Sequence, residues 1–239
     1  MNLDAAKLYE VCDQTWPAAR RWTAAGWTLR EGQGGGKRVS AATQADPDAD
    51  VAVAEAEMRA LGQAPLFMIR SGDAELDQLL AVRGYSVVDP VTMYRLPIER
   101  LMDVLIPPVT AFEIWEPLAI MEEIWASGGI GPGRLAVMAR AEIKTAILAR
   151  WNEHPAGVAF AAVHDGVCMV HAVEVLPHQR RQGVAGWIMR RAAFWAQENG
   201  AETMAVLCTH ENAPANRLYQ QLGFHRLCGY HYRQHPEDT

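Results

Sequence analysis

The segment between residues 171 and 199 constrains the fold more than any other part of the chain. An apolar run, His171-Ala172-Val173-Glu174-Val175-Leu176, precedes Arg180-Arg181-Gln182-Gly183-Val184-Ala185-Gly186, and a helix-periodic segment then continues to about Asn199. This order of patterns predicts a strand, a basic loop that contains glycine, and a helix.

The predicted loop has the properties of a phosphate-binding site. The first turn of a helix leaves backbone N–H groups unpaired and carries the positive end of the helix dipole. Gly183 and Gly186 have no Cβ and Ala185 has only a methyl group, so a ligand can approach the backbone closely. Arg180 and Arg181 add positive charge. The alternative is a solvated basic turn. The GxxxxGK[ST] and GxGxxG spacings of two common phosphate loops are both missing here.

A second motif follows at a short distance. Residues 203–209 have the composition of a strand, and the next segment reads Asn212-Ala213-Pro214-Ala215-Asn216-Arg217-Leu218-Tyr219-Gln220-Gln221-Leu222-Gly223-Phe224. Asn212 suits a helix N-cap, and Gly223 suits the left-handed residue that ends a helix. The segment therefore predicts a short helix that leads into another strand.

The two motifs together resemble the signatures of the GNAT superfamily of N-acetyltransferases. Arg180 to Ala185 resembles R/Q-x-x-G-x-G/A, and residues 212–224 resemble N-x-x-A-x-x-L-Y-x-x-x-G-F, with an approximate match at the centre. The resemblance implies an α+β GNAT fold, with a mixed, mostly antiparallel sheet flanked by helices, and acetyl-coenzyme A (acetyl-CoA) as the acyl donor. The residues that it implies for cofactor binding are Val173, Val175, Arg180, Arg181, Gln182, Gly183, Val184, Ala185, Gly186, Asn212 and Tyr219.

The reaction that the resemblance implies is direct attack of a primary amine on the acetyl thioester. An alkylammonium group has a pKa near ~10.4, so only about one molecule in a thousand is deprotonated at neutral pH and a general base is useful. Glu174 is the nearest candidate, because a carboxylate in an apolar strand is costly unless it is paired or functional. Strand alternation predicts that its side chain points away from those of Val173 and Val175, and also from His171. A pair with Arg180 is the alternative, and His210 is a second candidate base.

Tyr219 is the second candidate catalytic residue. The resemblance implies that it protonates the departing coenzyme A thiolate, whereas packing with the hydroxyl at the rim is the structural alternative. The sequence contains no evident His-Cys-Asp nucleophile set, which favours direct transfer over an acetyl-enzyme.

An internal similarity predicts two GNAT-like modules. The strand-like Pro65–Ile69, a helix and Arg83-Gly84-Tyr85 repeat the order found between Ala205 and Phe224. Prolines near residue 105 mark a boundary. We therefore expect a degenerate GNAT-like domain at 1–105, without a phosphate loop, and a catalytic N-acetyltransferase domain at 106–239.

Other local patterns give further expectations. Gly32 to Gly36 predicts a flexible hairpin, and Gly128 to Gly133 predicts a mobile loop that the resemblance places near the acceptor entrance. Strands are expected at residues 26–31, 38–42, 65–69, 91–96, 141–152, 156–164 and 167–176, and helices at 48–61, 74–82 and 112–127.

Composition limits the partners and the compartment. The net charge of −6 argues against a nucleic-acid partner and mildly suits a cationic amine, so we expect a small-molecule or peptide amine as acceptor. Four cysteines without metal-ligand spacing predict buried free thiols, a reducing compartment and no metal. The sequence shows neither a signal peptide nor an apolar membrane span, which predicts a cytoplasmic protein that does not enter a membrane. Whether the chain forms a homodimer is left open by the sequence.

Two alternatives to this function remain. The chain can bind an acyl-CoA without catalysis, as a sensor or regulatory protein, although Tyr219 and Glu174 favour an enzyme. The second alternative keeps the enzyme but changes the acyl donor: Trp187, where the helix begins, and the pocket near the Gly128 to Gly133 loop can alter acyl-chain or acceptor preference, and the sequence leaves this choice open.

Overall fold

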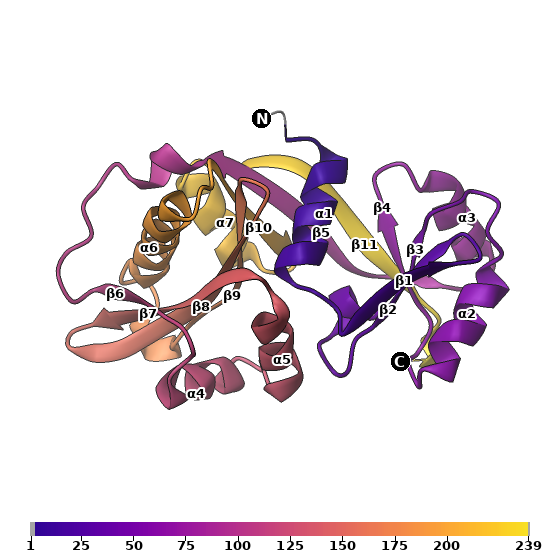
Figure 1. The fold of residues 1–239 in the computed structure, drawn as a ribbon, viewed down its shortest axis with the longest axis horizontal. Helices are drawn as coiled ribbons and strands as arrows, with labels where there is room; N and C mark the ends of the chain where they lie inside the picture. The colour runs from indigo at the N-terminus through magenta and orange to yellow at the C-terminus, as the bar shows by residue number, and fades with distance from the viewer. Residues whose placement is uncertain (1–2, 239) are drawn as a thin grey trace.

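A computed structural model describes residues 3–238, and an eight-stranded sheet runs through most of the molecule (Figure 1). All neighbouring strands in this sheet are antiparallel except one parallel pair, residues 167–175 with residues 203–209, so the predicted mixed, mostly antiparallel sheet is confirmed. In spatial order the strands are β4 (Leu66–Arg70), β11 (His225–Gln234), β5 (Ser86–Pro97), β10 (Thr203–Thr209), β9 (Val167–Val175), β8 (His154–His164), β7 (Ile143–Trp151) and β6 (Ala111–Ile114).

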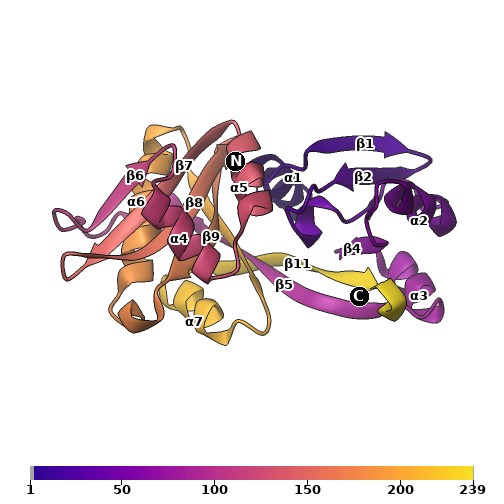
Figure 2. The ribbon, with the colours of Figure 1, turned by 90° about the horizontal axis from the view of Figure 1, so that it is seen from below.

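Helices cover both faces of this sheet. The longest, α6 (Val184–Glu198), packs with α7 (Ala213–Gln221) on one face. The opposite face is covered by α1 (Ala5–Thr15), α4 (Ala119–Ser127) and α5 (Pro132–Arg140). A smaller sheet of β1 (Arg20–Ala24), β2 (Trp27–Glu31) and β3 (Thr43–Gln44) forms a separate core with α2 (Val51–Ala60), α3 (Ala74–Val82) and β4 (Figure 2).

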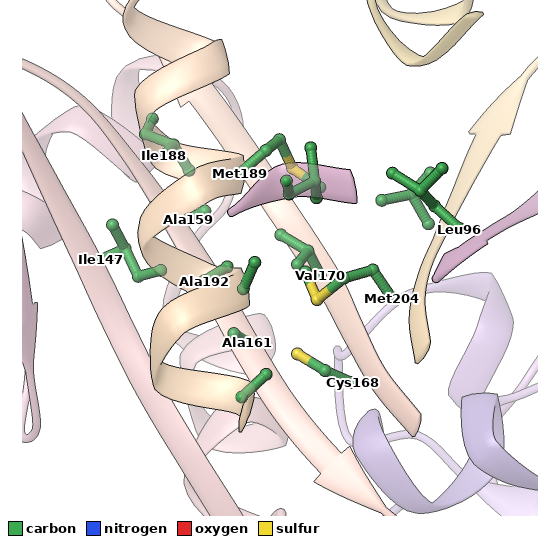
Figure 3. Packing of buried hydrophobic residues seen from close by; sticks show 14 of the residues in the cluster. Leu96, Ile147, Ala159, Ala161, Cys168, Val170, Ile188, Met189, Ala192 and Met204 are labelled. Atoms are coloured by element: carbon green, nitrogen blue, oxygen red, sulfur yellow. The ribbon is translucent and has the colours of Figure 1, made fainter. Parts of the chain in front are cut away.

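The packing of α6 follows from its sequence. Ile188, Ala192 and Ala196 repeat at four-residue spacing and are fully buried, so they form one apolar stripe along the helix. Figure 3 shows Ile188 and Ala192 facing side chains of β7 and β8, among them Ala159 and Ala161. Small residues on both sides let the helix approach the sheet closely, which fixes the position of the loop before α6.

The two ends of the chain exchange strands. The unit β4–α3–β5 has the same order as β10–α7–β11, and the sheet order β4-β11-β5-β10 places the last strand of each unit between strands of the other. Figure 1 shows β5 and β11 crossing the molecule side by side. Residues on both sides of the predicted boundary at 105/106 therefore share one sheet, and the division into two domains stays a prediction.

An ionic cluster fastens α1 to the small sheet. Asp13 on α1 lies 2.8 Å from the Nη2 atom of Arg30 on β2, and Arg30 is only 1% exposed. Arg21 and Arg70 also contact Asp13, at 3.5 and 3.3 Å. Burial acts to raise the pKa of Asp13, but the arginine charges, Arg30 first, outweigh it and hold that pKa below its usual value.

Two sequence expectations for secondary structure are wrong. Residues 112–127 do not form one helix, because Pro117 disfavours helical backbone at the preceding residue, and the segment divides into β6 and α4. Residues 38–42 are not a strand: a short 3₁₀ helix, Lys37–Val39, begins after Gly36, whose φ is +92°. The helix expected at 74–82 and the three strands that became β7, β8 and β9 are confirmed.

The two glycine segments are more ordered than predicted. In Gly128 to Gly133, α5 already begins at Pro132. The Gly32 to Gly36 segment packs against the first turn of α5, where a Cβ on Gly133 would collide with the backbone of Gly34. It is therefore a packed turn rather than a free hairpin.

The remaining expectations concern cysteines and membranes. All four cysteines are buried free thiols, as predicted. Within residues 3–238, no helix combines the length and the apolar character needed to cross a membrane.

Candidate active site

The predicted strand, loop and helix are confirmed at β9 and α6. Gly183 is the N-cap of α6 with φ of +81°, in the left-handed region that favours glycine, and Arg181 also has positive φ, at +65°. The Trp187 N–H donates to the Gly183 carbonyl at 3.2 Å. This is the first backbone hydrogen bond of α6. The N–H groups of residues 184–186 come before it in the helix, so they are the first-turn donors that a helix leaves unpaired.

Little surrounds the two glycines of this turn. A Cβ on Gly186 would have Arg190 Nη1, at 3.7 Å, as its nearest neighbour, and a Cβ on Gly183 would meet only Trp187 Nε1 at 4.0 Å. Arg180, Arg181 and Gln182 are exposed. Three backbone donors at the positive end of a helix dipole, with basic side chains beside them, suit a pyrophosphate.

A β-bulge changes which side chains share a face of β9. The register with β8 shifts between the pairs Val158–Glu174 and Phe160–His171, and Ala172 has φ of +51°. The extra residue brings His171 and Glu174 to the same face, so the expectation that they face opposite sides is wrong. Glu174 does point away from Val173 and Val175, which pack on the α6 side.

Beyond this bulge, one edge of β9 is free. Parallel pairing with β10 ends at Val170 and Val206. The Leu176 N–H donates to the Ala156 carbonyl on the β8 side at 2.9 Å. By alternation, the backbone groups of Val173 and Val175 therefore point to the edge where β10 has diverged. The Val175 carbonyl accepts a bond from Arg180 Nε at 3.0 Å.

Glu174 is paired rather than isolated. Its Oε1 atom accepts from Arg180 Nη2 at 3.3 Å, and the side chains of Arg180 and Glu174 are 57% and 21% exposed. Its other oxygen lies against Gly128 at the end of α4. The pair with Arg180 that the sequence left open is therefore present, and the role of Glu174 as a base stays a prediction.

Tyr219 lies on α7 at the other face of the sheet. It is 5% exposed and packs against Tyr94 and Phe224, with ring centroids 6.1 and 5.7 Å away. Within residues 3–238 its hydroxyl has no hydrogen-bond partner. Burial raises the pKa of Tyr219, so the phenol is neutral at neutral pH and can donate a proton.

Two asparagines hold α7 in place. Asn212 caps the helix as predicted, because its Oδ1 atom accepts from the Ala215 N–H at 3.1 Å. Asn216 was not singled out from the sequence: its Nδ2 donates to the Thr209 carbonyl at 2.9 Å, and its Oδ1 accepts from the Tyr94 hydroxyl at 2.8 Å. The sequence did contain a signal for this role: asparagine is a poor helix former, so its presence inside a short helix indicates that its side chain makes a specific contact.

A cavity of about 340 Å³ lies between the first hundred residues and the rest of the chain. His171 and Ala172 of β9 and Leu207 and Thr209 of β10 line it, so it reaches the point where these strands diverge. Its walls include the rings of Trp16, Tyr230 and Tyr232 and the basic side chains of Lys37, Arg38 and Arg134. Sequence reasoning missed these basic residues, because the Gly32 to Gly36 segment beside them was interpreted as a hairpin.

Two other expectations concern bases and metals. His210 is exposed at the end of β10, and its Nε2 atom lies 3.1 Å from the Thr92 hydroxyl. In the described part of the chain, no three His, Cys, Asp or Glu side chains gather as metal ligands would.

Comparison with known proteins supports the predicted family. Residues 111–224, which contain the α6 loop and α7, match the sequence model of the acetyltransferase (GNAT) family. This segment of the chain is therefore similar to that family over its phosphate-loop and α7 motifs. The predicted GNAT superfamily and acyltransferase class are therefore confirmed.

Relatives extend the similarity beyond this segment. An uncharacterized N-acetyltransferase of Bacillus subtilis, YobR, is 27% identical over 96% of this chain and 98% of its own length. A GCN5-related N-acetyltransferase from Kribbella flavida has a similar structure, with a TM-score of 0.73 at 22% identity over 97% of this chain and 95% of that one. A tandem GNAT protein from the clavulanic acid biosynthesis pathway gives a TM-score of 0.56 at 13% identity, over 76% of this chain and 67% of its own. These structural similarities confirm the α+β GNAT fold.

Proposed function

We propose that this GNAT protein transfers an acetyl group from acetyl-CoA to a primary amine of a small molecule or peptide. The observation that carries the proposal is a path of backbone groups that have no backbone partner. It runs from the free N–H groups of residues 184–186, along the open edge of β9, to the cavity at the divergence of β9 and β10.

Each part of acetyl-CoA would meet a matching group on this path. The pyrophosphate would accept hydrogen bonds from the first turn of α6, beside Arg180 and Arg181. The amides of the pantetheine arm would pair with the backbone of Val173 and Val175, as a further strand would. The thioester would then lie near the divergence, between the cavity on one face and Tyr219 on the other.

The chemistry divides between these two faces. An amine in the cavity would lose a proton, with Glu174 as the candidate base, and attack the thioester carbonyl. A carbon–nitrogen bond forms, and the carbon–sulfur bond breaks as the tetrahedral intermediate collapses. Tyr219 would give its proton to the departing thiolate, because burial keeps its phenol neutral. The nitrogen would lose its second proton to solvent as the amide forms, and the Tyr219 phenolate would regain a proton from solvent.

We also propose that residues 1–105 are a degenerate GNAT-like module. The repeated strand–helix–strand units and their exchanged last strands support an origin by duplication. The similarity in fold to a tandem GNAT protein supports the same arrangement. In this proposal the first module has no phosphate loop and serves to close the cavity, through Trp16, Lys37 and Arg38.

Calorimetric titration with acetyl-CoA, dephospho-coenzyme A and pantetheine tests the cofactor. We expect binding of the first two and at least tenfold weaker binding of pantetheine, which lacks the pyrophosphate. Equal binding of all three would contradict the loop assignment.

Release of free thiol in the presence of mixed amines distinguishes the enzyme from a sensor. An acetyltransferase consumes the thioester only when an amine is present. A sensor protects the thioester under all of these conditions, and that result would reject catalysis.

A further inference from the structure

The cavity between the two halves of the chain carries unbalanced positive charge. Lys37 is paired with Asp89 at 2.7 Å. Arg38 and Arg134 also line the cavity, and neither forms an ion pair with a carboxylate of residues 3–238. The only acidic residue lining the cavity is Asp89, so the lining of described residues has two more basic than acidic side chains.

Arg38 is held in one orientation by a chain of hydrogen bonds. Its Nη1 atom lies 2.9 Å from His171 Nδ1. A guanidinium can only donate, so Nδ1 must accept and the proton of the ring is on Nε2. That N–H donates to the Thr15 hydroxyl at 2.9 Å, and Thr15 in turn donates to the Val11 carbonyl at 2.7 Å.

The protonation of His171 agrees with this arrangement. Burial, and then the charge of Arg38, hold the pKa of His171 well below its usual value, so the ring is neutral. Both of its nitrogens are occupied. His171 is therefore a positioning residue for Arg38 and is not available as a base.

Beyond His171, the Arg38 guanidinium meets the phenol of Tyr230 but no carboxylate of residues 3–238. Its Nε atom is buried and has no hydrogen-bond partner, and the guanidinium lies over the Trp16 ring, 5.3 Å from its centroid. With Nη1 bound to His171, the N–H groups of Nε and Nη2 remain side by side. This edge matches the two oxygens of a carboxylate. A buried positive charge without a countercharge is costly, so an anionic ligand is the natural complement.

We propose that the acceptor is an amino-carboxylate, whose carboxylate binds Arg38 while its amine faces the divergence of β9 and β10. This inference rests on the proposed acetyltransfer. A volume of about 340 Å³ suits a small molecule of this kind. The net charge of the whole chain, −6, mildly suited a cationic amine. The lining of the cavity, however, carries an excess of positive charge, which favours an acceptor with an anionic group.

Steady-state thiol release with matched acceptors tests the inference. Each set contains an amino acid, its amide and its decarboxylated amine, and one further pair compares phosphoethanolamine with ethanolamine. The variants are Arg38→Gln and, as a control, Arg226→Gln, which removes an exposed arginine outside the cavity. Calorimetry with acetyl-CoA is run on every protein, and thermal melting checks folding.

The expected result is specific to one class of acceptor. The wild-type protein should prefer the amino acids, and Arg38→Gln should raise their KM by about 10- to 100-fold, the effect of losing charged hydrogen bonds. It should change kcat/KM of the decarboxylated amines less than about twofold, and leave acetyl-CoA binding intact. His171→Asn should raise the same KM with little change in kcat, as expected for a residue that only orients Arg38.

Other outcomes overturn the inference in distinguishable ways. If acetyl-CoA binds but no amino-carboxylate is acetylated, whether or not neutral or cationic amines are, the carboxylate site is wrong. The cofactor site is unaffected by that result. If the protein prefers phosphoethanolamine to ethanolamine and to the amino acids, the group that binds Arg38 is a phosphate and not a carboxylate. If acetyl-CoA does not bind at all, the proposed function and this inference fall together. If Arg38→Gln does not fold, the wild-type preference among the matched acceptors decides.

Discussion

Gly186→Val is the sharpest test of the predicted phosphate-binding loop. Gly186 lies in the first turn of α6, and the Cβ of a side chain there would have Arg190 Nη1, at 3.7 Å, as its nearest contact. The fold can therefore accept valine. Helix propensity favours valine over glycine by about 0.4 kcal/mol, so the free energy of unfolding should be unchanged or slightly higher. Gly183 is a poorer choice, because its φ of +81° strains any residue with a Cβ. A loss of acetyl-CoA affinity in a Gly183 variant could then come from a damaged fold instead of a lost contact.

The expected loss of affinity follows from the hydrogen bonds at stake. The valine side chain would project into the open space in front of the backbone donors and keep the pyrophosphate away from at least one of them. A hydrogen bond to a charged group contributes about 1.5–3 kcal/mol, so the Kd for acetyl-CoA should rise by roughly 10- to 150-fold. Pantetheine binding should change little, because pantetheine has no pyrophosphate.

Calorimetric titration of both ligands, with thermal melting alongside, measures these effects. Gly131→Val is the matched control, since Gly131 also lies in open space at the start of a helix, α5, but outside the predicted phosphate-binding loop at residues 180–186. It should leave the Kd for acetyl-CoA within about twofold of the wild-type value. A folded Gly186→Val protein with an unchanged Kd would refute the assignment of this loop to the pyrophosphate.

Three further substitutions test the candidate catalytic residues and the ionic cluster. Tyr219→Phe should lower kcat in the thiol-release assay without changing the melting temperature, because the hydroxyl has no partner within residues 3–238; unchanged turnover would make Tyr219 a packing residue. Glu174→Gln should lower kcat by about 100-fold or more if Glu174 is the base, while the loss of its half-exposed pair with Arg180 costs at most about 1 kcal/mol in denaturant unfolding. Asp13→Asn should destabilise the fold by about 3–5 kcal/mol, because it leaves Arg30 buried without its anion. Since the pKa of Asp13 is lowered on folding, its contribution is present above pH ~4 and disappears at lower pH; the difference between Asp13→Asn and wild type should shrink on acidification, and a constant difference would contradict the ion-pair explanation.

The sequence by itself determined the parts of this protein that depend on neighbouring residues. The loop before α6, the Asn212 cap and the left-handed Gly223 after α7 are all where their patterns predict them. Hydrogen bonds within a helix and caps at its ends span three or four residues, so their signals lie within one short segment. The signal against the helix expected at 112–127 was also local, because Pro117 already disfavours helical backbone at the residue before it.

Only the tertiary structure decided the face that each side chain presents and the partners that it meets. One bulge at Ala172 brought His171 to the face of Glu174, and a bulge depends on register with β8 rather than on a local pattern. The insertion of β5 between β10 and β11 joins residues more than a hundred positions apart. The contact between Arg38 and His171, separated by 133 positions, exists for the same reason. Strand pairing and buried charge are settled by the competition among all available contacts, and no short segment of the sequence contains that information.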